Sequence, residues 1–165
     1  MDQDQLCQIA ALFGQEPVGE IRELTSGHIN RTFLVECGGK ALVLQSLSPV
    51  FPKPENVMHN IAQVGRVFAD TPDRSVQIPE YLPCGARNFA EFQGEIWRMY
   101  PYAGASGEMS PFGTGAAFGE FIRILSSQNL RLKEALPGYH SFQGYFSRFM
   151  AASSASHSRK PDSAV

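Results

Sequence analysis

Two adjacent glycines, Gly38 and Gly39, separate two short runs that are typical of β-strands. The run before them, 32–37, is rich in β-branched and aromatic residues, and the run after them, 40–45, is mostly apolar. Such residues fit a pleated surface that is buried on one side. A two-glycine connection is a strong hairpin signal, because both turn positions then accept a positive φ. The sequence therefore predicts an antiparallel hairpin over residues 32–45.

A second turn, with the sequence Ser26-Gly27-His28-Ile29-Asn30, lies directly before this hairpin. Its small residues and its asparagine allow the backbone to bend sharply and leave N–H groups free. Because residues 18–24 form a plausible strand, the turn would join the first two of three antiparallel strands. Two interpretations stay open: an ordinary meander with a polar turn, or a loop whose backbone donors lie over phosphates. A lone glycine turn does not decide between them.

Amphipathic helices are predicted on both sides of the hairpin. An apolar stripe from Leu6 to Phe13 follows the helical repeat, and Gly14 can end that helix. A second helix is predicted over 55–69, where apolar residues share one face and Pro54 suits the first turn.

Further short strands are expected after the second helix. Residues 81–83 and 88–92 are interpreted as short strand pieces around a turn at Gly85, and 95–102 as the best late strand. After the first helix the predicted order is therefore β-β-β-α-β-β, an α+β fold with a five-stranded antiparallel sheet and one packed helix.

The last third of the chain is predicted to be helical and then disordered. Residues 104–107 are small and polar and are interpreted as a linker. Ser110 and Pro111 suit the start of a helix that runs to Ser127 and is apolar on most sides, and one more helix is expected over 143–152. Residues 151–165 have almost no apolar bulk, so we expect them to be disordered.

Composition excludes several classes of protein. The 165 residues carry a formal net charge of −2, so nothing favours binding to nucleic acid or to an anionic membrane. The apolar runs are too short to span a bilayer, and the first residues do not resemble a signal peptide. The three cysteines are far apart and lack metal-binding spacing. A cytoplasmic protein with reduced thiols is expected.

Several stretches, taken in chain order, resemble one known group of enzymes. Together they are similar to the N-terminal part of the aminoglycoside phosphotransferase and choline kinase-like superfamily, and within it to the N-acetylhexosamine 1-kinases. The resemblance covers roughly residues 13–149. The matching stretches are 27–35, 42–45, Val50-Phe51, Val57-Met58, Asn60-Ile61, 97–102 and 136–140.

The resemblance implies a protein-kinase-like fold. Residues 1–103 would form the small N-terminal lobe, 104–150 the start of a helical large lobe, and 151–165 a disordered tail. The implied activity is transfer of a phosphoryl group from ATP to a small molecule, an amino sugar if the closest similarity holds.

The resemblance also implies a nucleotide site, with ATP as the ligand. Its phosphate side would be the turn 27–31, formed by Gly27, His28, Ile29, Asn30 and Arg31. Gln45 stands where family members often have a lysine or arginine facing the phosphates, so a donor without charge occupies that position. Val43 would cover the adenine ring, and Met99, Tyr100 and Tyr102 match the segment that meets the adenine edge. A solvated charge at Arg31 and plain core strand at 99–102 would account for the same residues.

The chemical part of the implied site is missing from this sequence. Kinases of this superfamily carry a His-Gly-Asp catalytic loop and a later metal-binding aspartate, and no such motif occurs here. No catalytic or metal-binding residue is therefore predicted, and Mg²⁺ is expected only in a complete enzyme. We expect a truncated kinase that is inactive alone and associates with itself through an exposed helix.

Two alternatives to a truncated kinase stay open from the sequence. In the first, the chain is a non-catalytic interaction or regulatory module built on a kinase-like lobe. In the second, a large lobe is supplied by another chain. Binding of ATP separates the first alternative from the kinase interpretation.

Overall fold

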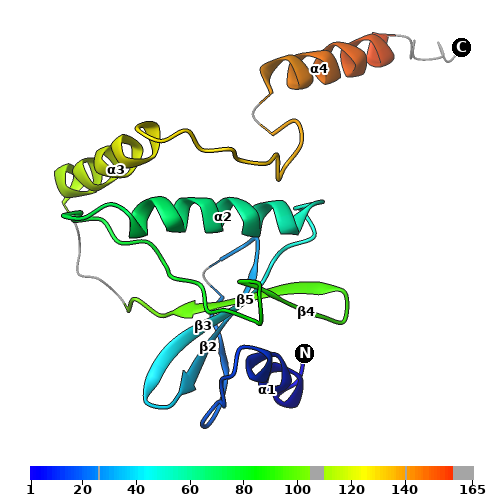
Figure 1. The fold of residues 1–165 in the computed structure, drawn as a ribbon. Helices are drawn as coiled ribbons and strands as arrows, with labels where there is room; N and C mark the ends of the chain where they lie inside the picture. Colours follow the sequence, from blue (N-terminus) through cyan, green and yellow to red (C-terminus); the bar gives the residue numbers. More distant parts are fainter. Residues whose placement is uncertain (26, 105–109, 140, 158–165) are drawn as a thin grey trace, which may run out of the picture. The chain divides into compact units, whose positions relative to one another are not determined.

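The computed structural model describes residues 1–25, 27–104, 110–139 and 141–157 of the chain (Figure 1). These residues belong to two compact units, Met1–Ala135 and Leu136–Val165. The first unit contains the sheet, and the second contains the last helix.

The first unit is built around a five-stranded antiparallel sheet with the strand order β1-β2-β3-β5-β4 (Figure 1). One helix, α2, connects β3 to the β4–β5 pair, so the predicted order β-β-β-α-β-β is confirmed. The α+β fold class with a sheet and one packed helix is confirmed with it. The strands are β1 (Arg22–Glu23), β2 (Arg31–Cys37), β3 (Lys40–Ser46), β4 (Ala90–Phe92) and β5 (Glu95–Pro101).

The predicted hairpin is formed by β2 and β3, which pair from Arg31 with Ser46 to Cys37 with Lys40. Gly38 and Gly39 make the turn with φ angles of 56° and 75°. Both angles lie in the left-handed region, which a side chain disfavours, so this connection requires glycine.

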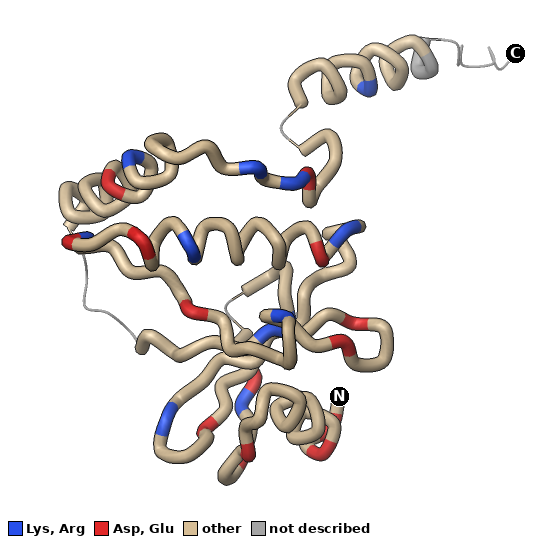
Figure 2. Tube along the Cα trace, viewed as in Figure 1, with Lys and Arg blue, Asp and Glu red and all other residues tan. Residues whose placement is uncertain are grey.

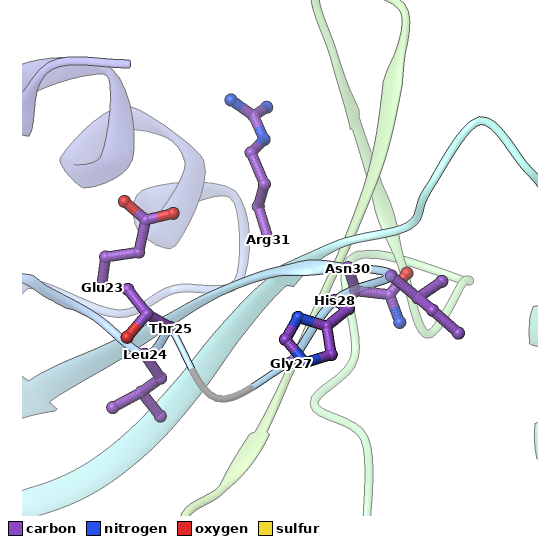
Figure 3. Close-up of a pocket in the computed structure, with 8 residues that line it drawn as sticks. Glu23, Leu24, Thr25, Gly27, His28, Asn30 and Arg31 are labelled. Carbon is purple, nitrogen blue, oxygen red and sulfur yellow. The ribbon is translucent and has the colours of Figure 1, made fainter.

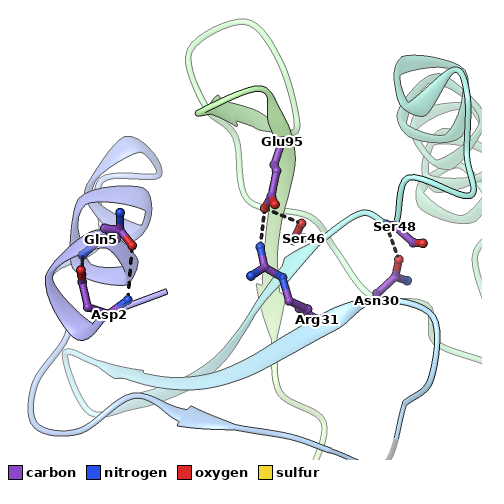
Figure 4. Close-up of polar contacts among 7 residues, drawn as sticks. All are labelled: Asp2, Gln5, Asn30, Arg31, Ser46, Ser48 and Glu95. Atoms are coloured by element: carbon purple, nitrogen blue, oxygen red, sulfur yellow. Dashed lines mark hydrogen bonds and ion pairs between the residues drawn. The ribbon is translucent and has the colours of Figure 1, made fainter.

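One face of the sheet is buried under α1 (Gln3–Leu12). Asp2 caps this helix in a reciprocal box with Gln5, drawn in Figure 4, and Gly14 follows its end with a φ of 68°. The core under α1 joins apolar residues of the helix with those of β2, β3 and β5. Its members are Leu6, Ile9, Ala10, Phe13, Ile21, Phe33, Val35, Cys37, Leu42, Leu44, Ala90, Trp97 and Met99.

The opposite face is partly covered by α2 (Pro54–Ala69). Met58 packs there against Leu47 and Ile96 in a smaller core. On its other side, α2 holds the segment that precedes residue 135: Asn60 exchanges hydrogen bonds of 2.7 and 2.8 Å with the backbone of Lys133. The helix therefore covers one end of the face, and both polar and apolar side chains of the strands occupy the remainder.

Helix α3 (Pro111–Ser126) begins as predicted, with the Ser110 hydroxyl accepting the Gly113 N–H at 3.1 Å. It packs on α2 through Phe68 and Phe121, whose ring centroids lie 5.6 Å apart. The compact unit therefore extends beyond residue 103, where the lobe boundary was predicted. Residues 105–107 of the predicted linker lie outside the described residues.

The second unit contains α4 (Phe142–His157). The Ser141 hydroxyl accepts the Gly144 N–H at 3.1 Å at its start. The helix extends five residues past the predicted end at 152, and the expected disorder from 151 is wrong for residues 151–157. Alanine is the best helix former, so the alanines of this segment continue the helix despite their small apolar surface. Residues 158–165 lie outside the described part.

Two predicted strands differ from the structure. The predicted strand 18–24 is reduced to the two residues of β1, because Gly19 with a φ of 80° interrupts it. Residues 81–83 are not a strand, although the Leu82 N–H donates to the Met99 carbonyl at 2.7 Å. Among the described helices none is long and apolar enough to cross a membrane.

Candidate functional site

The turn between β1 and β2 encloses a small open hollow of about 230 Å³ (Figure 3). The hollow is lined by Gly27, His28, Ile29 and Asn30 of the turn, by Arg31 at the start of β2, and by residues 23–25 at the end of β1. This volume is below the roughly 300–1,000 Å³ of pockets that enclose a whole small ligand. The hollow therefore suits one part of a nucleotide, such as a phosphate group. Ser26 lies outside the described residues.

The turn is fixed to the sheet by Asn30. The Ser48 N–H donates to the Asn30 Oδ1 at 2.9 Å, which joins the turn to the end of β3 (Figure 4). Among the described residues, no partner accepts a hydrogen bond from the backbone N–H groups of Gly27, His28 and Ile29. The side chain of Ile29 is 63% exposed. The predicted loop therefore offers backbone donors on a fixed base.

Arg31 is one of the residues that line the hollow, but its guanidinium group is held by other partners. Its guanidinium lies 2.5 Å from the Glu95 carboxylate and 5.7 Å from the centre of the Trp97 ring (Figure 4). Trp97 belongs to the core under α1, so this ion pair lies on the α1 face. In Figure 3 the side chain is directed away from His28. The predicted pairing of Arg31 with phosphate is not supported by this geometry.

A row of polar side chains crosses the opposite face of the sheet. Thr32, Gln45 and Arg98 occupy neighbouring positions on β2, β3 and β5. The Gln45 Nε2 donates to the Thr32 hydroxyl at 2.8 Å. Nε and Nη2 of Arg98 donate to the Gln45 Oε1 at 2.9 and 2.6 Å. The Thr32 hydroxyl in turn donates to the Asn30 carbonyl at 3.4 Å, so the row reaches the turn.

Two tyrosines lie beside the end of this row. The Arg98 guanidinium carbon is 5.2 Å from the centre of the Tyr81 ring, and the Tyr81 and Tyr100 rings are 5.1 Å apart. Burial raises the pKa of the Tyr100 phenol; the Arg98 charge opposes this rise, and Tyr81 adds to it. The Tyr100 phenol is therefore neutral at physiological pH and leaves the charge of Arg98 uncompensated.

The residues predicted to contact adenine differ in how accessible their side chains are. Val43 lies on the face of the polar row but is only 4% exposed, between its strand partners Leu34 and Tyr100. Met99 is fully buried in the core under α1, so its side chain faces away from the row. Tyr102 is 41% exposed, and its N–H donates to the Ala41 carbonyl at 2.9 Å. Of the predicted adenine contacts, Tyr102 is the most accessible.

Arg98 is the residue that the sequence prediction missed. It follows Trp97 in the stretch 97–102, which resembles the kinase superfamily. Its neighbour across the sheet, Gln45, is known only from the strand register. Alternation along β5 does place it on the same face as Tyr100.

The charges of the first unit give no sign of a metal site. Acidic and basic residues are interspersed along its trace in Figure 2. In the described ranges no group of three or more His, Cys, Asp and Glu side chains is placed to hold a metal ion. The described residues do not fit Mg²⁺.

Comparison with known proteins finds distant structural similarity. No family model matches the chain. The structure is similar to that of a thermostable mutant of the aminoglycoside phosphotransferase APH(4)-Ia in its apo form, with a TM-score of 0.45 and 17% sequence identity. The match covers 76% of this chain and 39% of that chain.

Proposed function

We propose that the face of the sheet carrying Thr32, Gln45 and Arg98 binds ATP, and that the chain is the ATP-binding N-terminal portion of a small-molecule phosphotransferase. The β1–β2 turn would hold phosphates through the backbone of Gly27, His28 and Ile29. This is the function that the arrangement of the described residues supports best.

The observation that carries the proposal is the continuous line of hydrogen bonds from Arg98 to the turn. It connects a cation to the turn that carries the unpaired backbone donors. Both groups are the usual partners of phosphate oxygens, because phosphoryl-transfer sites hold their substrate with backbone N–H groups and cations. The five-stranded sheet with one crossing helix is also the architecture that the resemblance implied.

The adenine ring is assigned to the neighbouring part of the same face. Leu34 and Tyr102 are accessible there, whereas Val43 is reached only after its neighbours move. An apolar strand surface next to an exposed tyrosine offers the flat contact that an aromatic base requires. Adenine binding therefore involves a small rearrangement around Val43.

The described residues neither identify the acceptor molecule nor carry out the transfer step. An amino-sugar acceptor follows from the resemblance to N-acetylhexosamine 1-kinases alone. Transfer needs a metal ion and a residue that orients the nucleophile, and the described residues do not supply the metal ligands. The chain by itself is therefore proposed to bind nucleotide without transferring phosphate.

Thermal unfolding of the chain with and without millimolar ATP tests this function. A ligand that binds only the folded state raises the melting temperature once its concentration exceeds the dissociation constant. We expect ATP to raise it and uridine to leave it unchanged. An unchanged melting temperature at about 5 mM ATP, a concentration that would occupy even a weak millimolar site, contradicts the proposal.

A second candidate function is an interaction module without nucleotide. The observation that favours it is the exposure of Phe112 and Phe118 on α3, at 87% and 65%. Large exposed apolar side chains on one element indicate a contact surface. Sedimentation of the chain against Phe118→Ser tests this candidate, which predicts self-association that the substitution removes. A monomer at all concentrations contradicts it.

A further inference from the structure

We propose that Arg98 is the phosphate-binding cation of this site, in place of a charged residue on β3. This inference rests on the proposed function for its ligand, a nucleoside triphosphate. The polyphosphate part of that ligand is the chemical group that Arg98 would recognise.

The first argument is the charge of Arg98. Arginine keeps its charge at all physiological pH values. Among the described residues no carboxylate pairs with it, and Glu95 pairs with Arg31 instead. The Arg98 side chain is partly buried and contacts the neutral amide of Gln45 and the ring of Tyr81. A partly buried cation without a counter-ion is favourable to an anionic ligand.

The second argument is the geometry of the guanidinium group. A guanidinium carries five N–H donors in a rigid fork. Two of its nitrogens, Nε and Nη2, donate to one oxygen of Gln45. The fork is thereby held in one orientation. Among the described residues, no group accepts a hydrogen bond from Nη1. A fixed planar fork suits two oxygens of a phosphate, which it can bind together.

Gln45 has a clear role in this arrangement. A lysine at position 45 would place a second positive charge directly opposite Arg98 on the neighbouring strand. Like charges at opposed strand positions are unfavourable. Glutamine instead accepts from Arg98 and donates to Thr32. Gln45 is therefore a positioning residue, and the charge that its own side chain lacks stands on the next strand.

The test measures binding of three ligands to the 165-residue chain by titration calorimetry. ATP carries base and phosphates, inorganic tripolyphosphate carries phosphates alone, and adenosine carries the base alone. The variants are Arg98→Met and, as a matched control, Arg123→Met, which removes an exposed arginine of α3. Circular dichroism of each variant checks the fold.

We expect Arg98→Met to weaken ATP and tripolyphosphate about tenfold or more, the usual effect of losing a hydrogen bond to a charged group. Adenosine binding by Arg98→Met and all binding by Arg123→Met should stay unchanged. If Arg98→Met does not fold, Gln45→Glu serves instead, because its carboxylate pairs with Arg98 and should cause a similar loss.

Each other outcome is decisive. ATP binding that survives Arg98→Met, or that falls equally with adenosine binding, overturns the inference and leaves the proposed function standing. Arg98-dependent binding of tripolyphosphate without binding of ATP supports the cation site and overturns the nucleotide function. A chain that binds neither ATP nor tripolyphosphate overturns both.

Discussion

The Glu95 carboxylate lies 2.5 Å from Nη2 of Arg31, although β3 separates their two strands in the sheet. The same carboxylate accepts a hydrogen bond from the Ser46 hydroxyl of β3 at 3.0 Å. One side chain of β5 therefore contacts both other central strands. This arrangement removes Arg31 from the nucleotide face and gives it a structural role.

Replacing Glu95 tests that structural role. The side chains of Arg31 and Glu95 are 43% and 41% exposed, so water and salt screen the pair. Glu95→Gln should lower the free energy of unfolding by no more than about 1 kcal/mol, and less at high salt. Urea unfolding at low and high salt measures the effect. An accompanying loss of ATP affinity would contradict the separation of the two faces.

The two glycine turns should respond differently to alanine. Gly38 has a φ of 56°, and alanine at such a position costs about 1–2 kcal/mol. Gly27 has no positive φ, and a Cβ there would meet nothing closer than the Asn30 carbonyl oxygen at 3.9 Å. Gly38→Ala should therefore lower the urea midpoint, and Gly27→Ala should leave it unchanged. Equal effects of the two changes would refute this account of the turns.

Gln45→Glu should separate stability from binding. The new carboxylate would face Arg98 across the 2.6 and 2.9 Å contacts that the amide now makes. Because the site is partly buried, the added ion pair should keep or raise the melting temperature, while it neutralises the phosphate-binding charge. Melting curves with and without ATP measure both effects. A variant that is destabilised and still binds ATP normally speaks against the proposed role of Arg98.

The contact between α3 and the loop after α2 should depend on pH. The Glu120 carboxylate accepts hydrogen bonds from the hydroxyl and the N–H of Ser75, and these hold its pKa below the ordinary 4.5. A lowered folded-state pKa means that the stabilisation is complete above the ordinary value. It is lost as the pH falls from 4.5 through the folded-state pKa.

Glu120→Gln is the control for this pH dependence, since glutamine does not titrate. Below pH 4.5 the melting temperature of the unsubstituted chain should fall more steeply than that of the variant. Parallel curves for the two proteins would exclude Glu120 as the titrating group.

Local signals in the sequence predicted most of the fold. The hairpin depends on Gly38 and Gly39, and α3 depends on Ser110, Pro111 and an apolar pattern; all of these act over a few residues. The length of β1 was missed because a single residue, Gly19, interrupts the run. The extension of α4 cannot be predicted from apolar content, because alanine favours a helix while adding little apolar surface.

The candidate site was less accessible to sequence reasoning. The face of the sheet on which Arg31 lies could have been predicted, because strand alternation groups it with buried Phe33 and Val35. The contact of Gln45 with Arg98 could not, since the two are 53 positions apart in the chain and only the register of β3 on β5 brings them together. The turn 27–30 was placed correctly beside the sheet, but its function as a phosphate loop remains a proposal.

The most direct test of the proposed nucleotide site is to map the residues that ATP contacts. Backbone and side-chain amide signals of the ¹⁵N-labelled protein report this position during a titration with ATP. The account predicts that the largest shifts belong to the N–H groups of Gly27, His28 and Ile29, the Gln45 amide and the Arg98 Nε–H. Shifts concentrated on α1 or around Arg31, with these groups unmoved, would contradict it.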